Sequence, residues 1–265
     1  MVLSAYVMPM FAKLGLTLFL MVTVPPEARA ACRIVPHLAI DYAVCDVDPA
    51  TASLRIFHAD DSGRPYGGFT ALKTDLLRDQ TRLDFGMNGG MYEKDLSSVG
   101  LLVIDGVERK PIATGEGWGN FYLLPNGVFA LSNGRAIVRE TEAYRRSAVA
   151  VPDYATQSGP MLVIDGALHP AFKPESDSLQ IRNGVGVDAK GIVHFAVSLS
   201  PVRFHDFATL YRDVLGCPNA LFLDGHISSL YAPELGRVDE TYPMGPIIAA
   251  TTPMWHGAVV PEPAP

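Results

Sequence analysis

Short stretches of apolar residues, bounded by Gly, Asn, Asp or Pro, follow one another along most of this chain. Runs of about four to eight residues with this punctuation are typical of β-strands. Asn-Gly and Asp-Gly pairs, which favour tight hairpin turns, stand at 105–106, 126–127, 133–134 and 165–166. We therefore expect strands near 38–46, 53–59, 83–87, 100–104, 107–111, 120–124, 128–132, 135–140, 160–164, 184–188, 192–199 and 220–223.

Two segments instead place apolar residues at helical spacing. In GFTALKTDLLRDQ, the residues of the apolar face are Phe69, Leu72, Leu76 and Leu77. In FHDFATLYRDVLGCP, which ends at a Gly and a Pro, they are Phe207, Leu210, Tyr211, Val214 and Leu215. No low-complexity linker divides the chain, so we expect one α+β domain. It should be β-rich, with mixed sheets, several hairpins and two main helices.

The order strand, helix, strand occurs twice. The segment 53–87 leads into Asn88, and the segment 192–223 leads into Asp224. Such a unit can form a parallel crossover, and ligands collect beyond the carboxyl ends of the strands in sheets of this kind. The repeat favours Asn88 and Asp224 as neighbours of a binding site.

The first 30 residues have the features of a secretory signal peptide. Lys13 precedes the apolar stretch 14–24, and Ala28-Arg29-Ala30 has the form of a cleavage site. The stretch is shorter than the roughly 20 residues of a membrane span. We expect a signal peptide at 1–30, a folded domain at 31–258 and a disordered tail at 259–265. The protein would then be exported, periplasmic or secreted, without a stable membrane span; an uncleaved anchor is the alternative.

In an oxidising compartment Cys32 and Cys45 can form a disulfide, whereas Cys217 is expected to be a small packed residue. The cysteines and histidines do not have the spacing of a metal site, so we predict no metal and no other cofactor. The chain has 265 residues, of which 48% are hydrophobic and 18% charged, and a formal net charge of −7. This acidity, without a basic block, argues against a nucleic-acid partner.

Four polar stretches adjoin expected strands: MNGGMY (87–92), ATQSGPM (155–161), IRNGVGV (181–187) and LDGHISS (223–229). Asn88 and the glycines after it can bring an amide and backbone N–H groups close to a ligand, or simply form a tight turn. Arg182 can hold a phosphate with two donors, or it can be half of a structural ion pair. Asp105 and Asp165 are better explained as turn residues than as paired carboxylates. Turn chemistry explains Asp224 less well, which favours it as a functional group.

Taken together and in this order, these stretches, with the GLLVIDG and ALFLDGHISSLYA sequences, resemble the phosphodiester glycosidase domain family. The resemblance runs from about Leu54 to Ala250 and is greatest for bacterial exported members. It implies an α+β fold and hydrolysis of a sugar-1-phosphodiester, so the expected partner is a small-molecule or glycan substrate that bears a phosphodiester. By this resemblance Asp224 and Arg182 would be catalytic. The residues expected to bind substrate are Asn88, Gly89, Gln157, Ser158, Gly225, His226 and Ser228.

One departure from the family pattern leaves other functions open. In the lysosomal members of this family, a run of glycines follows the aspartate. Here His226 and Ile227 replace two of those glycines. The alternative function is therefore a non-catalytic exported protein that binds a phosphorylated sugar or a cell-wall fragment. A metal-dependent phosphodiesterase is less supported, because clustered His and carboxylate ligands are not evident.

Overall fold

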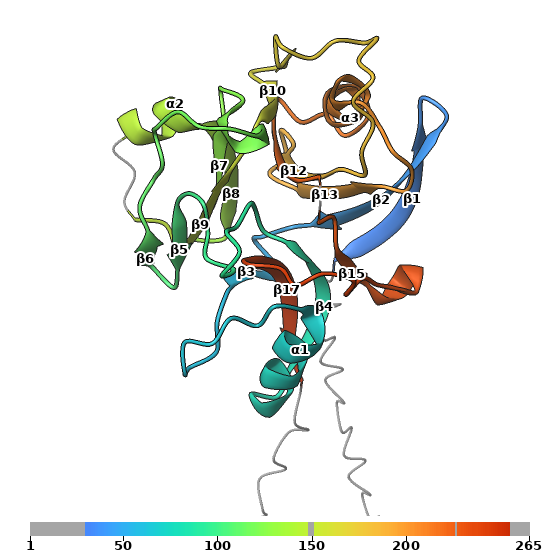
Figure 1. The fold of residues 1–265 in the computed structure, drawn as a ribbon. Helices are drawn as coiled ribbons and strands as arrows, with labels where there is room; N and C mark the ends of the chain where they lie inside the picture. The colour runs from blue at the N-terminus through green and yellow to red at the C-terminus, as the bar shows by residue number, and fades with distance from the viewer. Residues whose placement is uncertain (1–29, 148–150, 226, 255–265) are drawn as a thin grey trace, which may run out of the picture.

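The computed structural model describes residues 30–147, 151–225 and 227–254, which form three β-sheets with a few helices (Figure 1). Sheet 1 has the strand order β1 (Ala31–His37), β2 (Ile40–Val47), β13 (Val193–Ser198), β12 (Asn183–Val187), β14 (Asn219–Asp224), β10 (Met161–Ile164) and β11 (Ala167–Leu168). Sheet 2 has the order β16 (Arg237–Val238), β15 (Leu230–Ala232), β4 (Thr81–Asn88), β17 (Ile247–Pro253) and β3 (Ser53–Phe57). Sheet 3 has the order β6 (Val107–Lys110), β5 (Leu102–Ile104), β9 (Tyr154–Ser158), β7 (Gly127–Ser132) and β8 (Arg135–Glu140).

The helices are short and lie at the outside of the sheets (Figure 1). The α-helices of the described residues are α1 (Phe69–Arg78), α2 (Thr141–Arg146) and α3 (Phe204–Thr209). The π-helical turn η2 (Leu210–Val214) continues α3, and the 3₁₀ turns are η1 (Asn120–Tyr122) and η3 (Pro233–Leu235). None of these helices is long and apolar enough to cross a bilayer. The result is the expected β-rich α+β domain.

Both expected strand–helix–strand units are present, but each encloses an additional strand. β3 and β4 are joined through α1, and both pair antiparallel with β17, which lies between them. β13 and β14 are joined through α3 and η2, and both pair antiparallel with β12. The two outer strands of each unit therefore run parallel without sharing hydrogen bonds. As a result, the ladders between the described strands are antiparallel rather than the mixture that the expected mixed sheets would have, and neither unit makes the direct parallel pair that was possible.

One aromatic cluster connects all three sheets in the core. Phe195 of β13 contacts Phe85 of β4 with ring centroids 4.8 Å apart, and Phe129 of β7 with centroids 6.0 Å apart. All three side chains are 0% exposed. Because one side chain from each sheet meets here, the sheets share a single hydrophobic core.

Several local expectations differ from the structure. The segment 38–46 is the second half of a hairpin, whose turn at Leu38 and Ala39 has positive φ angles without a Gly or Asn signal. The segment 120–124 contains the turn η1 rather than a strand. Leu77 and Val214 are exposed, because the buried stripes of their helices pass through the neighbouring positions.

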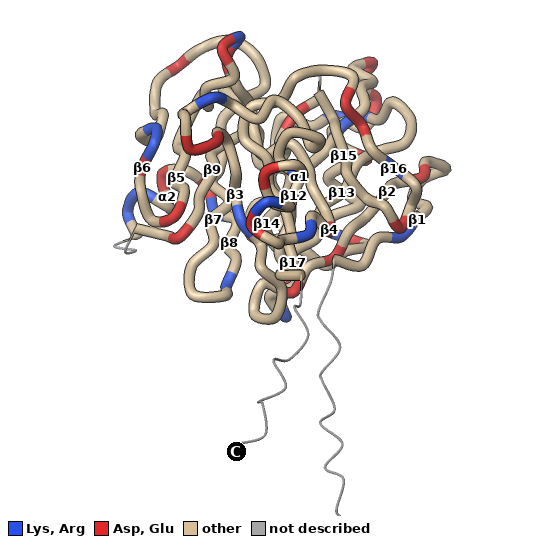
Figure 2. The backbone as a smooth tube through the Cα atoms, turned by 90° about the horizontal axis from the view of Figure 1, so that it is seen from below, with Lys and Arg blue, Asp and Glu red and all other residues tan. Residues whose placement is uncertain are grey.

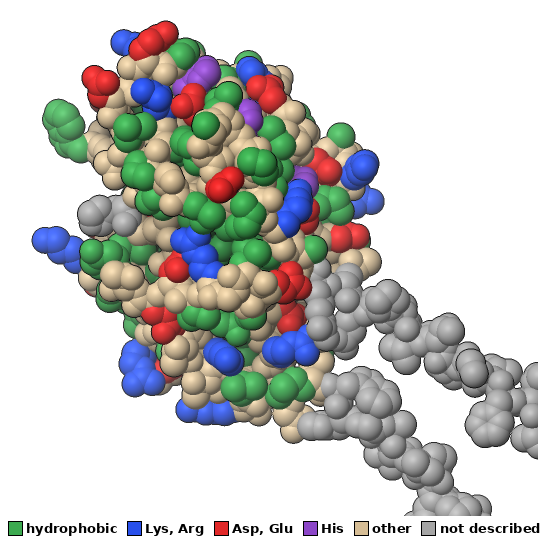
Figure 3. Space-filling model, turned by 90° about the vertical axis from the view of Figure 1, so that its right-hand side faces the viewer, with side chains coloured by type: hydrophobic (Ala, Val, Ile, Leu, Met, Phe, Trp, Pro, Cys, Tyr) green, Lys and Arg blue, Asp and Glu red, His purple; other side chains and the backbone are tan. Residues whose placement is uncertain are grey.

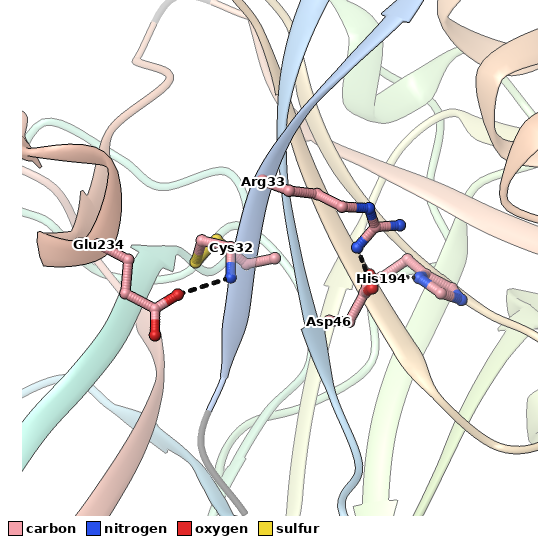
Figure 4. Close-up of a disulfide and its surroundings, with 6 residues drawn as sticks. Cys32, Arg33, Asp46, His194 and Glu234 are labelled. Atoms are coloured by element: carbon pink, nitrogen blue, oxygen red, sulfur yellow. Dashed lines mark hydrogen bonds and ion pairs between the residues drawn. A yellow bond between two sulfur atoms is a disulfide. The ribbon is translucent and has the colours of Figure 1, made fainter.

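The expected disulfide is present between Cys32 and Cys45, which lie opposite each other in the β1–β2 ladder (Figure 4). It connects β1, the edge strand of sheet 1, to its neighbour β2. The backbone N–H of Cys32 also donates to a carboxylate oxygen of Glu234 at 2.9 Å. The expected signal peptide at 1–30 and the tail at 259–265 lie outside the described residues, except for Ala30.

The surface carries charges of both signs. Acidic and basic residues are interspersed along the backbone (Figure 2). On the face shown in Figure 3, hydrophobic, charged and histidine side chains are likewise intermingled. These views therefore show no large field of a single sign.

Candidate active site

The four polar stretches predicted from the sequence meet where the three sheets join. Thr156 donates from Oγ1 to the carbonyl oxygen of Gly89 at 2.6 Å, which connects the second stretch to the first. Ser158 donates from Oγ to the carbonyl oxygen of Leu223 at 2.9 Å, which connects the second stretch to the fourth. Residues far apart in sequence are thus held together by buried hydrogen bonds.

Two buried asparagines complete this convergence. Asn88 ends β4 and Asn183 begins β12, and both are 0% exposed. Nδ2 of Asn183 donates to Oδ1 of Asn88, which also accepts the backbone N–H of Ser229 at 3.0 Å. In the described part of the chain, Nδ2 of Asn88 has no hydrogen-bond partner. A buried donor left in this state is uncommon and marks a place where a ligand or a water can complete the bonding.

Asp224 is positioned by the same network. Its backbone N–H donates to Oδ1 of Asn183 at 2.8 Å, where β14 ends and its register with β12 shifts. Its carboxylate oxygen Oδ1 accepts the backbone N–H of Ile227 at 3.3 Å. The strand therefore ends with a carboxylate whose backbone is held by a buried amide, while the side chain borders open space.

That space is a cavity of about 500 Å³, large enough for a small ligand. Asp224 lies on its wall, and the charged residues Glu93 and Lys94 belong to the same lining. The lining residues are Met91, Tyr92, Glu93, Lys94, Val99, Trp118, Gly119, Asn120, Phe121, Tyr122, Asp224 and Ile227. Two acidic residues (Glu93 and Asp224), one basic residue (Lys94) and several aromatic residues thus line one hollow.

The pKa of Tyr92, a residue of the cavity lining, is affected by the charge of Asp224. Burial, together with the nearby negative charge of Asp224, raises the pKa of Tyr92 to about 12. Its hydroxyl donates to the carbonyl oxygen of Pro243 at 2.6 Å. The side chain of Tyr92 is therefore an uncharged part of the cavity lining near Asp224.

Gln157 uses its whole amide within the protein. Oε1 accepts the backbone N–H groups of Leu101 at 3.1 Å and Ala113 at 2.8 Å. Nε2 donates to the carbonyl oxygen of Ala113 at 2.7 Å and to Oγ1 of Thr141 at 3.2 Å. These four bonds occupy both donors and both lone pairs. A sugar contact by Gln157 stays a prediction; what the structure shows is that this side chain holds the backbone of Ala113.

Arg182 directly precedes Asn183, the first residue of β12. Successive side chains of a strand point to opposite faces, so Asn183 reaches the asparagine network and Arg182 does not. Arg182 is 1% exposed and its guanidinium stacks over the ring of Phe204, 3.5 Å from the centroid. Nε donates to the carbonyl oxygen of Val202 at 2.9 Å, and a terminal nitrogen donates to that of Ser178 at 3.1 Å.

This environment indicates a structural role for Arg182. Burial lowers the pKa of Arg182 to about 10. In the described part of the chain, the partners of its guanidinium are carbonyl oxygens, the hydroxyl of Ser178 and aromatic rings rather than a carboxylate. It is also not among the residues that line the cavity. The geometry does not bring Arg182 to the cavity, and its expected contact with phosphate stays a prediction.

The remaining expected binding residues lie around Asp224 or Asn88. Gly89 packs so closely that a Cβ would stand 3.0 Å from Ile248, and a Cβ on Gly225 would stand 2.9 Å from the Phe222 ring. Ser228 donates from Oγ to the carbonyl oxygen of Asp224 at 3.2 Å. His226 lies outside the described residues. Backbone proximity and this hydroxyl thus shape the loop after β14.

Sequence reasoning passed over several residues that matter here. Asn183 follows Arg182 directly, and the alternation along β12 was the signal that distinguishes the two. Tyr92, Lys94 and Trp118 line the cavity but have no sequence signature of their own. Asp105 and Asp165, the two aspartates of the Asp-Gly turns, are not among the residues that line the cavity. Asp105 and Asp165 occupy hairpin turns with φ angles of 50° and 47°, as turn chemistry predicts.

Comparisons with known proteins identify the family of this site. Residues 81–247 match the family model of phosphodiester glycosidases. The chain is 32% identical to the uncharacterised protein YigE of Escherichia coli over 185 residues, 70% of this chain and 72% of YigE.

Two solved structures have the same fold at low identity. The catalytic domain of zebrafish N-acetylglucosamine-1-phosphodiester α-N-acetylglucosaminidase, auto-inhibited by its pro-peptide, is 11% identical with a TM-score of 0.57. The alignment covers 84% of this chain and 82% of that domain. A hypothetical protein from Synechocystis is 15% identical with a TM-score of 0.50, over 84% of this chain and 62% of that protein. From the match over residues 81–247, together with the relationship to YigE, this chain belongs to the phosphodiester glycosidase family.

Proposed function

We propose that this protein is an exported hydrolase that cleaves a sugar-1-phosphodiester. The observation that carries the proposal is the position of Asp224, at the end of a buried strand and on the wall of a cavity of about 500 Å³. Membership of the phosphodiester glycosidase family gives the reaction class. The zebrafish structure with the same fold is described as an N-acetylglucosaminidase acting on such a phosphodiester, which suggests a first substrate to test.

The chemistry fits the groups on this wall. A phosphate leaving group departs as a stabilised anion, so support of the positive charge that develops at the sugar matters more than a strong general acid. Asp224 can provide that support through its negative charge, or it can act as a nucleophile or as a base for water. Lys94 places a positive charge in the same cavity, where a phosphate needs it. The unpartnered Nδ2 of Asn88 is a donor held beside Asp224 through Asn183.

Export is supported by the predicted signal peptide and by the Cys32–Cys45 disulfide (Figure 4). Disulfides persist in oxidising compartments such as the periplasm and the extracellular space. These two features support the proposal that the mature protein is exported. Cell fractionation, with N-terminal sequencing of the exported form, tests this: a protein recovered from the cytoplasm with residues 1–30 intact argues against it.

The decisive test is a substrate panel. The purified protein is incubated with methyl phosphodiesters of several α- and β-linked sugars, and the release of free sugar is followed by chromatography. We expect release from at least one α-linked member, N-acetylglucosamine being the first candidate. Saturable binding without release would instead support the non-catalytic binding protein, and neither binding nor release would reject both functions.

A further inference from the structure

The side chain of Trp118 stands almost wholly in solvent although it lines the cavity. It is 98% exposed and borders the same hollow as Asp224. An indole normally removes about 150–250 Å² from water when it is packed in a folded protein. An aromatic side chain of this size, exposed at the edge of a cavity, offers an apolar surface that a ligand can contact.

The backbone around Trp118 is shaped to present it. Gly117 lies against the ring of Tyr122, so closely that a Cβ there would stand 2.5 Å from the ring atoms. Gly119 has a φ of 90°, a conformation that side chains rarely adopt, and it precedes the turn η1. Trp118 therefore stands between two positions that require glycine, one packed on the cavity wall and the other turning the chain.

The loop is also anchored where it begins. Gln157, which is 0% exposed, binds both the N–H and the carbonyl oxygen of Ala113 with one amide group. A paired contact of this kind fixes the direction in which the backbone leaves the core. The start of the loop is held by a buried side chain and its end by a packed 3₁₀ turn, with Trp118 between them.

We propose that Trp118 is the stacking platform for a pyranose ring of the phosphodiester substrate. A pyranose presents C–H groups on its faces and hydroxyls at its rim, and the electron-rich face of an aromatic ring attracts such C–H groups. Asp224 and Lys94 belong to the same lining, where the anomeric centre and the phosphate of such a substrate would lie. This inference rests on the proposed function, and it assigns to the loop 113–119 the recognition of the sugar. Gln157 acts through the loop and is a positioning residue.

The pyranose ring that stacks on Trp118 can belong to either of two sugars. It is either the glycosyl unit that is released or a sugar on the other side of the phosphate. The sequence contains two tryptophans, Trp118 and Trp255, so Trp255→Phe leaves Trp118 as the single tryptophan, which is excited selectively at wavelengths that tyrosine does not absorb. This protein, also carrying Asp224→Asn to prevent turnover, is titrated with four probes. They are dimethyl phosphate, free N-acetylglucosamine, its α-linked methyl phosphodiester, and a diester that carries a sugar on both sides.

We expect a saturable change in fluorescence with the sugar-bearing diesters and none with dimethyl phosphate. Trp118→Ala in the otherwise natural chain should raise KM about tenfold with little change in kcat, because a stacked ring is bound equally before and during reaction. Trp118→Phe should recover part of the loss. Equal losses for both diesters assign the platform to the released sugar, and a loss confined to the two-sugar diester assigns it to the other one.

The matched control is Leu38→Ala, which truncates a 58% exposed side chain in the β1–β2 turn, outside the cavity lining. It should leave KM and binding unchanged. Affinity for all sugar-bearing probes that is the same in Trp118→Ala as in its parent, measured by calorimetry, overturns the proposal. A saturable fluorescence change without hydrolysis by the natural chain would retain the platform and reject the hydrolase, so the two inferences fail separately.

Discussion

Nδ2 of Asn183 donates to Oδ1 of Asn88, and this bond joins sheet 1 to sheet 2 at the point where β14 ends. The other end of the same amide accepts the backbone N–H of Asp224 at 2.8 Å. One side chain therefore sets the position of two groups that the sequence predicts for the site. A buried amide that is used at both ends also makes the arrangement sensitive to single substitutions.

Asn183→Ala should destabilise the protein and impair the site together. It removes the acceptor of the Asp224 N–H and one donor to Asn88, and unsatisfied buried groups cost about 1–3 kcal/mol. Denaturant unfolding measures the first effect and sugar release the second. Asn219→Ala is the control, because that amide contacts Asp165 at a surface turn and its loss should cost under about 1 kcal/mol. An Asn183→Ala protein with natural stability would contradict the role of this network.

Asp224→Asn should abolish sugar release while the fold is retained. The substitution keeps the shape of the side chain and the backbone bond to Asn183, but it removes the charge that supports the developing cation. The free energy of unfolding should change by no more than about 1–2 kcal/mol. Turnover numbers and denaturation curves are measured on the same preparation, with Asp165→Asn as the control. Retained turnover in Asp224→Asn would remove this residue from the mechanism.

Arg182→Ala should unfold more easily without losing phosphate selectivity. The substitution removes the guanidinium donors to the carbonyl oxygens of Val202 and Ser178 and opens a void beside Phe204, at a cost of about 2–4 kcal/mol. Arg182→Lys should recover only part of this stability, because an ammonium lacks the planar donor fork. Melting temperature and phosphodiester affinity are measured as a pair. A natural melting temperature with lost phosphate affinity would restore the catalytic role predicted from the sequence.

Asp46 should make the stability depend on acid pH (Figure 4). Burial alone would raise the pKa of Asp46, but the hydrogen bond and charge of His194, together with Arg33, outweigh burial and hold this pKa below its usual value. A carboxyl group whose pKa is lowered on folding stabilises the protein above its ordinary pKa, and the contribution is lost as pH falls through the folded-state value.

Urea midpoints measured from neutral pH down to about pH 3 test this. The midpoint should fall less steeply with acid in Asp46→Asn than in the natural protein, because the substituted side chain no longer takes up a proton. Identical slopes for the two proteins would show that Asp46 does not contribute to the acid dependence.

Short-range chemistry is what the sequence determined by itself. The Asp-Gly turns at 105–106 and 165–166 and the Asn-Gly turn at 133–134 form hairpins, because positive φ angles suit these residues locally. Helix α1 follows its apolar stripe, and the polar stretches lie at strand ends as predicted. These features depend on neighbours within a few residues, so the pattern along the chain suffices.

The tertiary structure decided which of those polar groups reach the cavity. Insertion of β17 between β3 and β4, and of β12 between β13 and β14, brings Asn88 and Asp224 to one junction through Asn183. Arg182, directly before β12, instead lies against an aromatic cluster. Alternation along the chain separates Asn183 from Arg182, but no local signal encodes which of the two meets the network, because the pairing of distant strands and the buried face are set by burial of the shared core.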